Sequence, residues 1–118
     1  MYHILEESHG NIIGIRVQGK ITAEDYATLL PFVEGLIRQH GSIRVFSDLR
    51  DYEGIELGAV LKSIPYSFKY SSRVEKKAII TEKQWIKSWT KFLSPFFHTK
   101  VKCFSFSQID EAWNWLKN

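Results

Sequence analysis

The strongest constraint on the fold is an alternation of short strand patterns with longer helical patterns along the whole chain. In the strand segments apolar residues recur at every second position, as Ile13, Ile15 and Val17 do. In the helical segments they recur every three or four residues. The expected strands are 2–8, 11–18, 43–49, 75–81 and 100–106, and the expected helices are 22–41, 56–71, 83–93 and 107–117. The resulting order is β-β-α-β-α-β-α-β-α.

This order predicts an α/β fold with a mixed five-stranded sheet in a single domain, residues 1–118. A glycine-containing link near Gly10 predicts that the first two strands form an antiparallel hairpin. Helical connections between the later strands predict right-handed crossovers and parallel pairing. The length of 118 residues suits one domain with one ordinary hydrophobic core.

Local signals predict where the elements begin, end and bend. Thr22 is expected to cap the first helix. Pro31 predicts a kink or a division into two short helices, and Pro65 predicts a bend in the second helix. Residues 50–54 are expected to form a polar loop after the third strand. Ser107 through Asp110 resembles a capping box that opens the last helix. In helix 56–71 one face is expected to contain Leu57, Val60, Leu61, Ile64 and Phe68.

Several function classes lack their sequence signatures. The chain has no apolar run long enough for a transmembrane helix and no secretory signal, and Cys103 is its one cysteine. We therefore expect a cytoplasmic protein without disulfides, with Cys103 in the core. No phosphate-binding glycine motif or nucleophile elbow is present, and the four histidines are scattered. We accordingly expect no catalytic residue, no cofactor and no metal site.

The most polar candidate site combines two segments, one directly after the third strand and one directly after the fourth strand. Ligands in open α/β sheets bind beyond the carboxyl ends of parallel strands, where both segments should lie. Carboxylates there would serve acid–base chemistry if their pKa values differed, but capping of the loop and of the next helix by Asp48 and Asp51 is the favoured interpretation. The predicted ligand-binding residues are Asp48, Asp51, Tyr52, Glu82, Trp85 and Trp89.

Helix 83–93 carries a basic stripe beside a broad aromatic face. The stripe is Lys83, Lys87 and Lys91, and the face is Trp85, Trp89, Phe92 and Phe96. Packing against the sheet is the favoured interpretation, followed by contact with a membrane or an apolar ligand, and then by single-stranded nucleic acid. Residues 1–58 have a net charge of −4 and residues 59–118 a net charge of +7. The total of +3 is too small to favour nucleic acid.

Four stretches together resemble the SpoIIAA-like family of small bacterial proteins, which are relatives of STAS domains. They are GKITAEDYATLLPFVEGLIRQHGSIRVFSDLRDYEG, KKAIITEKQW, FFHTKVKCFSF and DEAWNWL, and they span roughly residues 10–116. The resemblance implies a mixed sheet that begins β-β-α-β, in an architecture similar to that of CRAL-TRIO lipid carriers. True anti-sigma-factor antagonists carry a phosphorylatable serine in a DSSGLG-like segment. The matching residues 53–58 contain no serine or threonine, so we expect no phosphoserine switch.

We therefore expect a non-enzymatic binding module for a protein partner or a small apolar, lipid-like ligand. Movement near Pro95 would open a pocket between helix 83–93 and the sheet. One alternative is a small enzyme that uses the Asp48–Tyr52 loop with Glu82. Another is a peripheral membrane protein that binds through helix 83–93. We expect no nucleic-acid partner. Exposed strand edges favour pairing with a second copy of the chain, so a homodimer is one possible partner arrangement.

Overall fold

A computed structural model describes residues 1–70, 72–93 and 98–118; Pro95 and Phe96 lie outside these ranges. The strands are β1 (Tyr2–Ile4), β2 (Ile12–Ile21), β3 (Ile43–Ile55), β4 (Val74–Ile80) and β5 (Lys100–Phe104). The helices are α1 (Ala23–His40), α2 (Leu57–Tyr70), α3 (Gln84–Leu93) and α4 (Ile109–Lys117), with a short 3-10 helix η2 (Phe106–Gln108) before α4. Among the described residues, no helix has the length and apolar character needed to cross a membrane.

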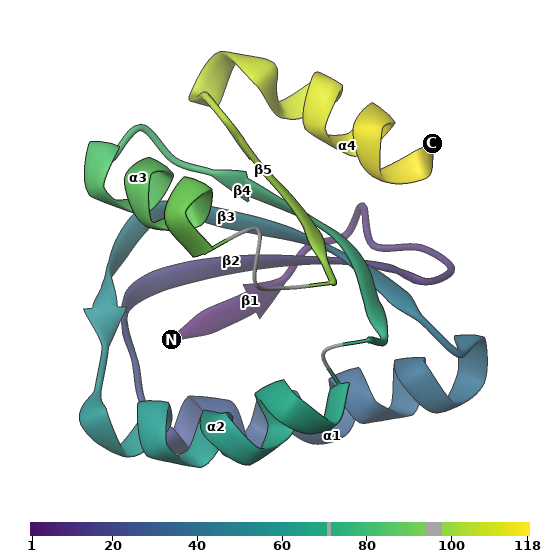
Figure 1. Ribbon diagram of the computed structural model, residues 1–118, viewed down its shortest axis with the longest axis vertical. Helices are drawn as coiled ribbons and strands as arrows, with labels where there is room; N and C mark the ends of the chain where they lie inside the picture. Colours follow the sequence, from purple (N-terminus) through teal and green to yellow (C-terminus); the bar gives the residue numbers. More distant parts are fainter. Residues whose placement is uncertain (71, 94–97) are drawn as a thin grey trace.

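The five strands form one mixed sheet in the order β1-β2-β3-β4-β5 (Figure 1). β1 pairs antiparallel with β2, whereas β2, β3, β4 and β5 pair in parallel. The predicted fold class is therefore confirmed, including the antiparallel hairpin at the N-terminus. Each parallel connection steps in the same direction across the sheet, so right-handed crossovers place α1, α2 and α3 on one face.

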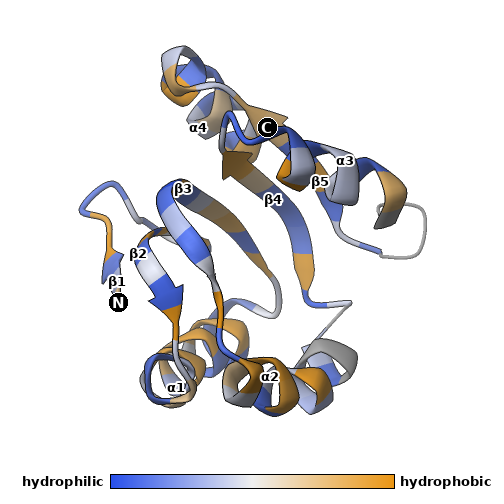
Figure 2. Cartoon of the chain, turned by 90° about the vertical axis from the view of Figure 1, so that its left-hand side faces the viewer, coloured by the Kyte–Doolittle hydropathy of each residue, from blue (hydrophilic) through white to orange (hydrophobic). Residues whose placement is uncertain are grey.

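Helices cover both faces of the sheet, and each face has its own hydrophobic core. Figure 2 shows α1 and α2 on one side of the sheet and α4 on the other. The core beneath α1 contains Ile13, Ile15, Val17, Ile37 and Ile43. The core beneath α4 contains Ile12, Phe46, Ala78, Ile80, Phe104, Ala112, Trp113 and Leu116. The two faces of β4 therefore differ, because Ala78 and Ile80 point towards α4 and Ile79 between them points away.

The core beneath α4 is centred on a stacked aromatic pair. The rings of Phe46 and Trp113 have their centroids 4.2 Å apart and are nearly parallel. Gly14 of β2 lies directly against this pair, because a Cβ atom added there would come within 2.8 Å of the Trp113 ring. A side chain at position 14 would therefore collide with Trp113.

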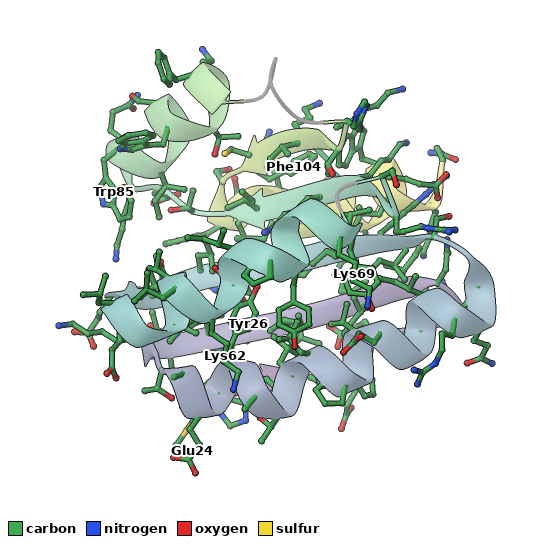
Figure 3. All side chains as sticks on the ribbon, turned by 60° about the horizontal axis from the view of Figure 1, so that its bottom comes forward. Glu24, Tyr26, Lys62, Lys69, Trp85 and Phe104 are labelled. Atoms are coloured by element: carbon green, nitrogen blue, oxygen red, sulfur yellow. The ribbon has the colours of Figure 1, made fainter. Side chains whose placement is uncertain are left out.

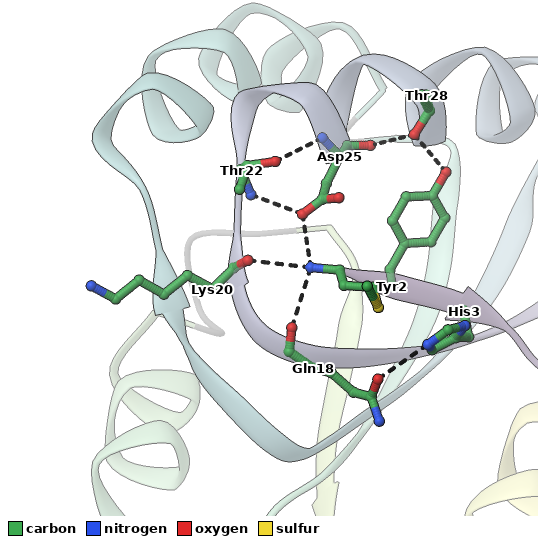
Figure 4. Close-up of polar contacts among 8 residues, drawn as sticks. Tyr2, His3, Gln18, Lys20, Thr22, Asp25 and Thr28 are labelled. Atoms are coloured by element: carbon green, nitrogen blue, oxygen red, sulfur yellow. Dashed lines mark hydrogen bonds and ion pairs between the residues drawn. The ribbon is translucent and has the colours of Figure 1, made fainter.

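The predicted start of α1 is confirmed in detail (Figure 4). The Thr22 hydroxyl accepts a hydrogen bond from the Asp25 amide, and the Asp25 carboxylate accepts one from the Thr22 amide, both at 3.0 Å. The amino group of Met1 donates to the same carboxylate at 2.9 Å. These contacts lower the pKa of Asp25, and the hydrogen bond from the Thr22 backbone is the largest cause.

Replacing Asp25 by asparagine should lower the free energy of unfolding by about 1 kcal/mol at pH 7. The depressed pKa means that ionised Asp25 stabilises the fold above its unfolded pKa of about 4, and that this stabilisation is lost as the pH falls through the folded-state pKa. The difference between wild type and Asp25→Asn in urea unfolding should therefore shrink between pH 7 and pH 3. Glu24→Gln, in the same helical turn, is the control, and an equally large pH-dependent difference there would contradict the prediction.

The segment expected as a polar loop, residues 50–54, is part of β3, and this expectation is wrong. β2 extends to Ile21 and pairs with this part of β3, with Gln18 opposite Asp51 and Gly19 opposite Tyr52. The side chains of Asp51 and Glu53 are exposed, so the strand accepts polar residues here. Residues 50–54 have the polar composition of a loop because this end of the strand is exposed to solvent.

Three further expectations about element boundaries are wrong. α1 is one helix that contains Pro31, so the first helix is not divided into two, and α2 likewise continues through Pro65. The capping box before α4 joins Ser105 and Gln108 rather than Ser107 and Asp110, since the Gln108 side chain accepts from the Ser105 amide at 3.0 Å. β1 ends at Ile4 because the chain turns, with the Ser8 amide bonded to the Leu5 carbonyl.

Candidate functional site

The first predicted site residue, Asp48, lies in β3 and is 3% exposed. Both of its carboxylate oxygens accept hydrogen bonds from the Arg50 guanidinium, and the shortest is 2.6 Å from Nη2 to Oδ2. The Arg50 amide adds a third donor at 3.1 Å. The hydrogen bond to Asp48 raises the pKa of Arg50, whose guanidinium also lies over the Phe106 ring. Both the backbone amide and the guanidinium of Arg50 therefore donate hydrogen bonds to the Asp48 carboxylate.

The other two predicted carboxylates lie in different surroundings. Asp51 forms an ion pair of 2.6 Å with Arg16 of β2, and this hydrogen bond lowers the pKa of Asp51. Glu82 is exposed in the segment that joins β4 to α3. Within the described ranges, no hydrogen bond or ion pair joins Glu82 to Asp48 or Asp51. The three predicted carboxylates therefore do not form one cluster: Asp48 pairs with Arg50, Asp51 pairs with Arg16, and Glu82 is exposed.

Tyr52 and Trp85, by contrast, are brought together. Their ring centroids lie 6.4 Å apart, so the end of β3 meets the first turn of α3. The Lys83 ammonium donates a hydrogen bond to the Tyr52 carbonyl oxygen. Burial raises the pKa of the Tyr52 hydroxyl. Two of the predicted residues therefore share one apolar contact at the carboxyl edge of the sheet.

The aromatic residues of α3 face solvent, which overturns the favoured interpretation that they pack against the sheet. Trp85, Trp89 and Phe92 are 53%, 57% and 67% exposed, whereas Ile86 is buried. Figure 3 shows Trp85 projecting outward from α3. The Trp89 and Phe92 rings meet edge to face, with centroids 6.2 Å apart. The spacing of i, i+4 and i+7 aligns the three side chains along one side of the helix.

α2 carries a matching stripe, which sequence reasoning placed on one face of the helix without identifying it as a candidate site. Leu57, Leu61 and Ile64 are 72%, 61% and 46% exposed. They also have the spacing i, i+4 and i+7. α2 packs mainly against α1, where the Tyr70 hydroxyl donates to Glu34. The sequence signal was that α2 is apolar on more than one side. We call these two sets of three residues the α2 stripe and the α3 stripe.

The stripes lie on the two helices that precede and follow β4 in the chain. α2 leads into β4 and α3 leads out of it, so right-handed crossovers place the helices on either side of β4. Lys77 is at the middle of this strand, between Val45 of β3 and Val101 of β5. Its burial lowers the pKa of its ammonium. Sequence reasoning also missed Lys77, although two consecutive lysines in a central strand place one of them on each face.

A polar hollow of about 400 Å³ lies at the opposite, amino ends of the parallel strands. Its lining includes Arg44, Lys76 and Lys100. Arg44 donates to the Leu116 carbonyl at 2.5 Å, and Lys76 donates to the Trp115 carbonyl at 3.0 Å. These cations therefore stabilise the carboxyl end of α4. In the described part of the chain, no group of three histidine, cysteine or acidic side chains is placed to hold a metal ion.

Comparisons with known proteins agree with this architecture. The SpoIIAA-like family model matches residues 12–117. A solved protein of the DUF3478 family from Shewanella loihica PV-4, described as uncharacterised with a SpoIIAA-like fold, is 23% identical, with a TM-score of 0.80 over 98% of this chain and 93% of its own. No protein with a curated description matches the chain at a significant level.

Two structures of SpoIIAA share the fold at much lower identity. The anti-sigma factor antagonist SpoIIAA in its unphosphorylated form is 8% identical, with a TM-score of 0.65 over 100% of this chain and 99% of its own. The Bacillus cell fate determinant SpoIIAA in the phosphorylated form is 10% identical, with a TM-score of 0.56 over 94% of this chain and 97% of its own. The family match extends over nearly the whole chain, and the protein belongs to the SpoIIAA-like family.

Proposed function

We propose that this protein is a non-enzymatic cytoplasmic module that binds a small apolar, lipid-like ligand between the α2 stripe and the α3 stripe. The observation that carries the proposal is the exposure of six large apolar side chains, three with the same spacing on each of the two helices that precede and follow β4. The exposed fractions range from 46% to 72%. Single exposed apolar residues are common on protein surfaces, whereas several aligned along one side of a helix form an apolar patch, and apolar patches are typical of interaction sites.

The energetics favour an apolar occupant. Full burial of one large apolar side chain contributes about 1.5–3 kcal/mol relative to exposure in water. Even partial covering of six such side chains offsets a large part of the entropy lost on binding. Trp85 and Trp89 add flat ring surfaces that pack well against an acyl chain, and they lose little side-chain entropy on binding.

The carboxylates support a binding role rather than catalysis. The enzyme alternative requires free carboxylates at the end of β3, but Asp48 pairs with Arg50 and Asp51 pairs with Arg16. The start of α2 also supports a function without a phosphoserine switch. Residues 53–58 run from β3 into this helix and contain no serine or threonine that could carry a phosphate there.

Titration with the neutral apolar dye N-phenyl-1-naphthylamine tests the proposal. The dye should bind saturably, with a dissociation constant in the micromolar range, and its fluorescence should rise. Leu61→Glu and Trp89→Glu, one variant in each stripe, should each weaken binding at least tenfold because a charge would enter the apolar contact. Phe32→Glu is the matched control, since Phe32 of α1 is also 46% exposed but lies outside both stripes.

Equal weakening by all three variants, or by none, would contradict a site between the stripes. Native mass spectrometry of the freshly purified protein provides a second measurement, in which a bound small apolar molecule is the expected result. An adduct with another protein or with a second copy of the chain would instead favour the protein-partner alternative. Flotation with anionic vesicles that is lost when Lys83, Lys87 and Lys91 are replaced by glutamate would favour the membrane alternative.

A further inference from the structure

Lys77 lies on the face of β4 that carries the helices with the two stripes. The next residue, Ala78, packs beneath α4 on the opposite face, and strand residues alternate between faces. The preceding lysine also points to the α4 side, where its ammonium donates to the Trp115 carbonyl. The side chain of Lys77 therefore extends towards the region between α2 and α3.

Among the residues that the structure describes, those around Lys77 are apolar and include no counter-ion. Its partners in register on the two neighbouring strands are Val45 and Val101, and Ile79 follows on the same face. Across the described ranges, no hydrogen bond or ion pair involves Lys77. Burial alone lowers its pKa, and no neighbouring charge contributes. An unpaired cation in such a place destabilises a fold unless an anion joins it.

Lys77 lies on the strand that connects the two helices carrying the stripes. α2 and α3 flank β4, so a molecule that lies between the two stripes passes over the face of the strand that bears Lys77. Such a molecule meets apolar side chains along its length and one ammonium at the strand. A single positive charge matches a single negative charge, whereas a dianionic phosphate is usually held by several donors.

We propose that the ligand is a single-chain amphiphile with a carboxylate head, such as a fatty acid, and that Lys77 pairs with the head while the chain packs between the α2 stripe and the α3 stripe. This inference rests on the proposed function and names the class of its ligand. It assigns Lys77 the role of selecting the head group, separate from the role of the stripes in binding the chain.

Competition with bound N-phenyl-1-naphthylamine tests the inference, using dodecanoate and 1-dodecanol below their aggregation limits. In the wild type both compounds should displace the dye. Lys77→Met should weaken the binding of dodecanoate at least tenfold and change that of 1-dodecanol less than twofold. Lys77→Arg should retain most of the affinity for dodecanoate. Lys117→Met, which removes an exposed lysine on α4, is the matched control and should change neither affinity.

The outcomes separate this inference from the proposed function. If neither compound displaces the dye, both are wrong. If 1-dodecanol binds but Lys77→Met leaves dodecanoate binding unchanged, the stripes bind apolar chains and the role of Lys77 is overturned. Dodecyl phosphate that binds tenfold more tightly than dodecanoate would overturn the carboxylate assignment. The methionine variant should remain folded because it replaces an unpaired charge with an apolar chain of similar length, and Lys77→Gln gives the same test if it does not.

Discussion

Replacing Trp113 by alanine is expected to lower the free energy of unfolding by about 3–5 kcal/mol, the usual range for a buried tryptophan. Trp113 is 8% exposed, and its ring stacks on Phe46 at the centre of the core beneath α4. Removing the ring leaves a cavity between α4 and the sheet, because β2 and β3 are held by their backbone hydrogen bonds and cannot close around it. Urea unfolding followed by far-ultraviolet circular dichroism measures the loss.

Gly14 provides an internal test of this contact. Gly14→Ala places a methyl group against the Trp113 ring and should cost about 1–3 kcal/mol. Combined with Trp113→Phe, which shortens the ring, Gly14→Ala should cost clearly less than it does alone. Gly35→Ala in α1 is the control, since a Cβ added there meets no atom within 4 Å apart from its chain neighbours and the backbone of its own helix. Strictly additive effects of the Gly14 and Trp113 substitutions would show that the two residues do not meet.

Replacing Arg50 by methionine is expected to cost about 2–4 kcal/mol. The substitution leaves the Asp48 carboxylate buried without its main partner, and breaking a buried pair from one side costs about 3–5 kcal/mol. Because the Arg50 side chain is 34% exposed, water screens part of the pair and the expected loss is lower. Unfolding in urea at pH 7 again provides the measurement.

The double variant Asp48→Asn, Arg50→Met should recover part of this loss, because it also removes the stranded charge. Arg16→Met breaks the more exposed pair with Asp51 and should cost only about 0–1 kcal/mol. An Arg50→Met variant as stable as Arg16→Met would show that Asp48 does not depend on Arg50. Asp48 would then again be available for the catalytic alternative.

The order of the elements could be predicted from the sequence, because periodicity reports directly how side chains alternate along a strand or a helix. The end of β3 could not be predicted in the same way. Its pairing partner is the extension of β2 to Ile21, about thirty residues earlier in the chain, and the polar residues 50–54 by themselves resemble a loop. The length of β3 depends on pairing with β2, and the local composition of residues 50–54 does not reveal that partner.

The candidate site was predicted less well than the fold, for a related physical reason. Spacing showed that Trp85 and Trp89 share one side of a helix, but it does not show which side the sheet covers. In α3 the covered side contains Ile86, and in α2 it is the side that packs against α1. The polar residues of β3 also suggested a site, although Asp48 depends on an arginine only two residues away.

The strand order has a consequence for how the chain folds. Each strand after β1 pairs with the strand that directly precedes it in the sequence. Adding a strand to the sheet therefore orders only the single connection between these two strands. The entropy lost on closing a connection grows with its length, and native contacts that are near in sequence favour fast folding. The sheet can therefore grow outward from a single strand-helix-strand unit, with each new strand added to an edge that already exists.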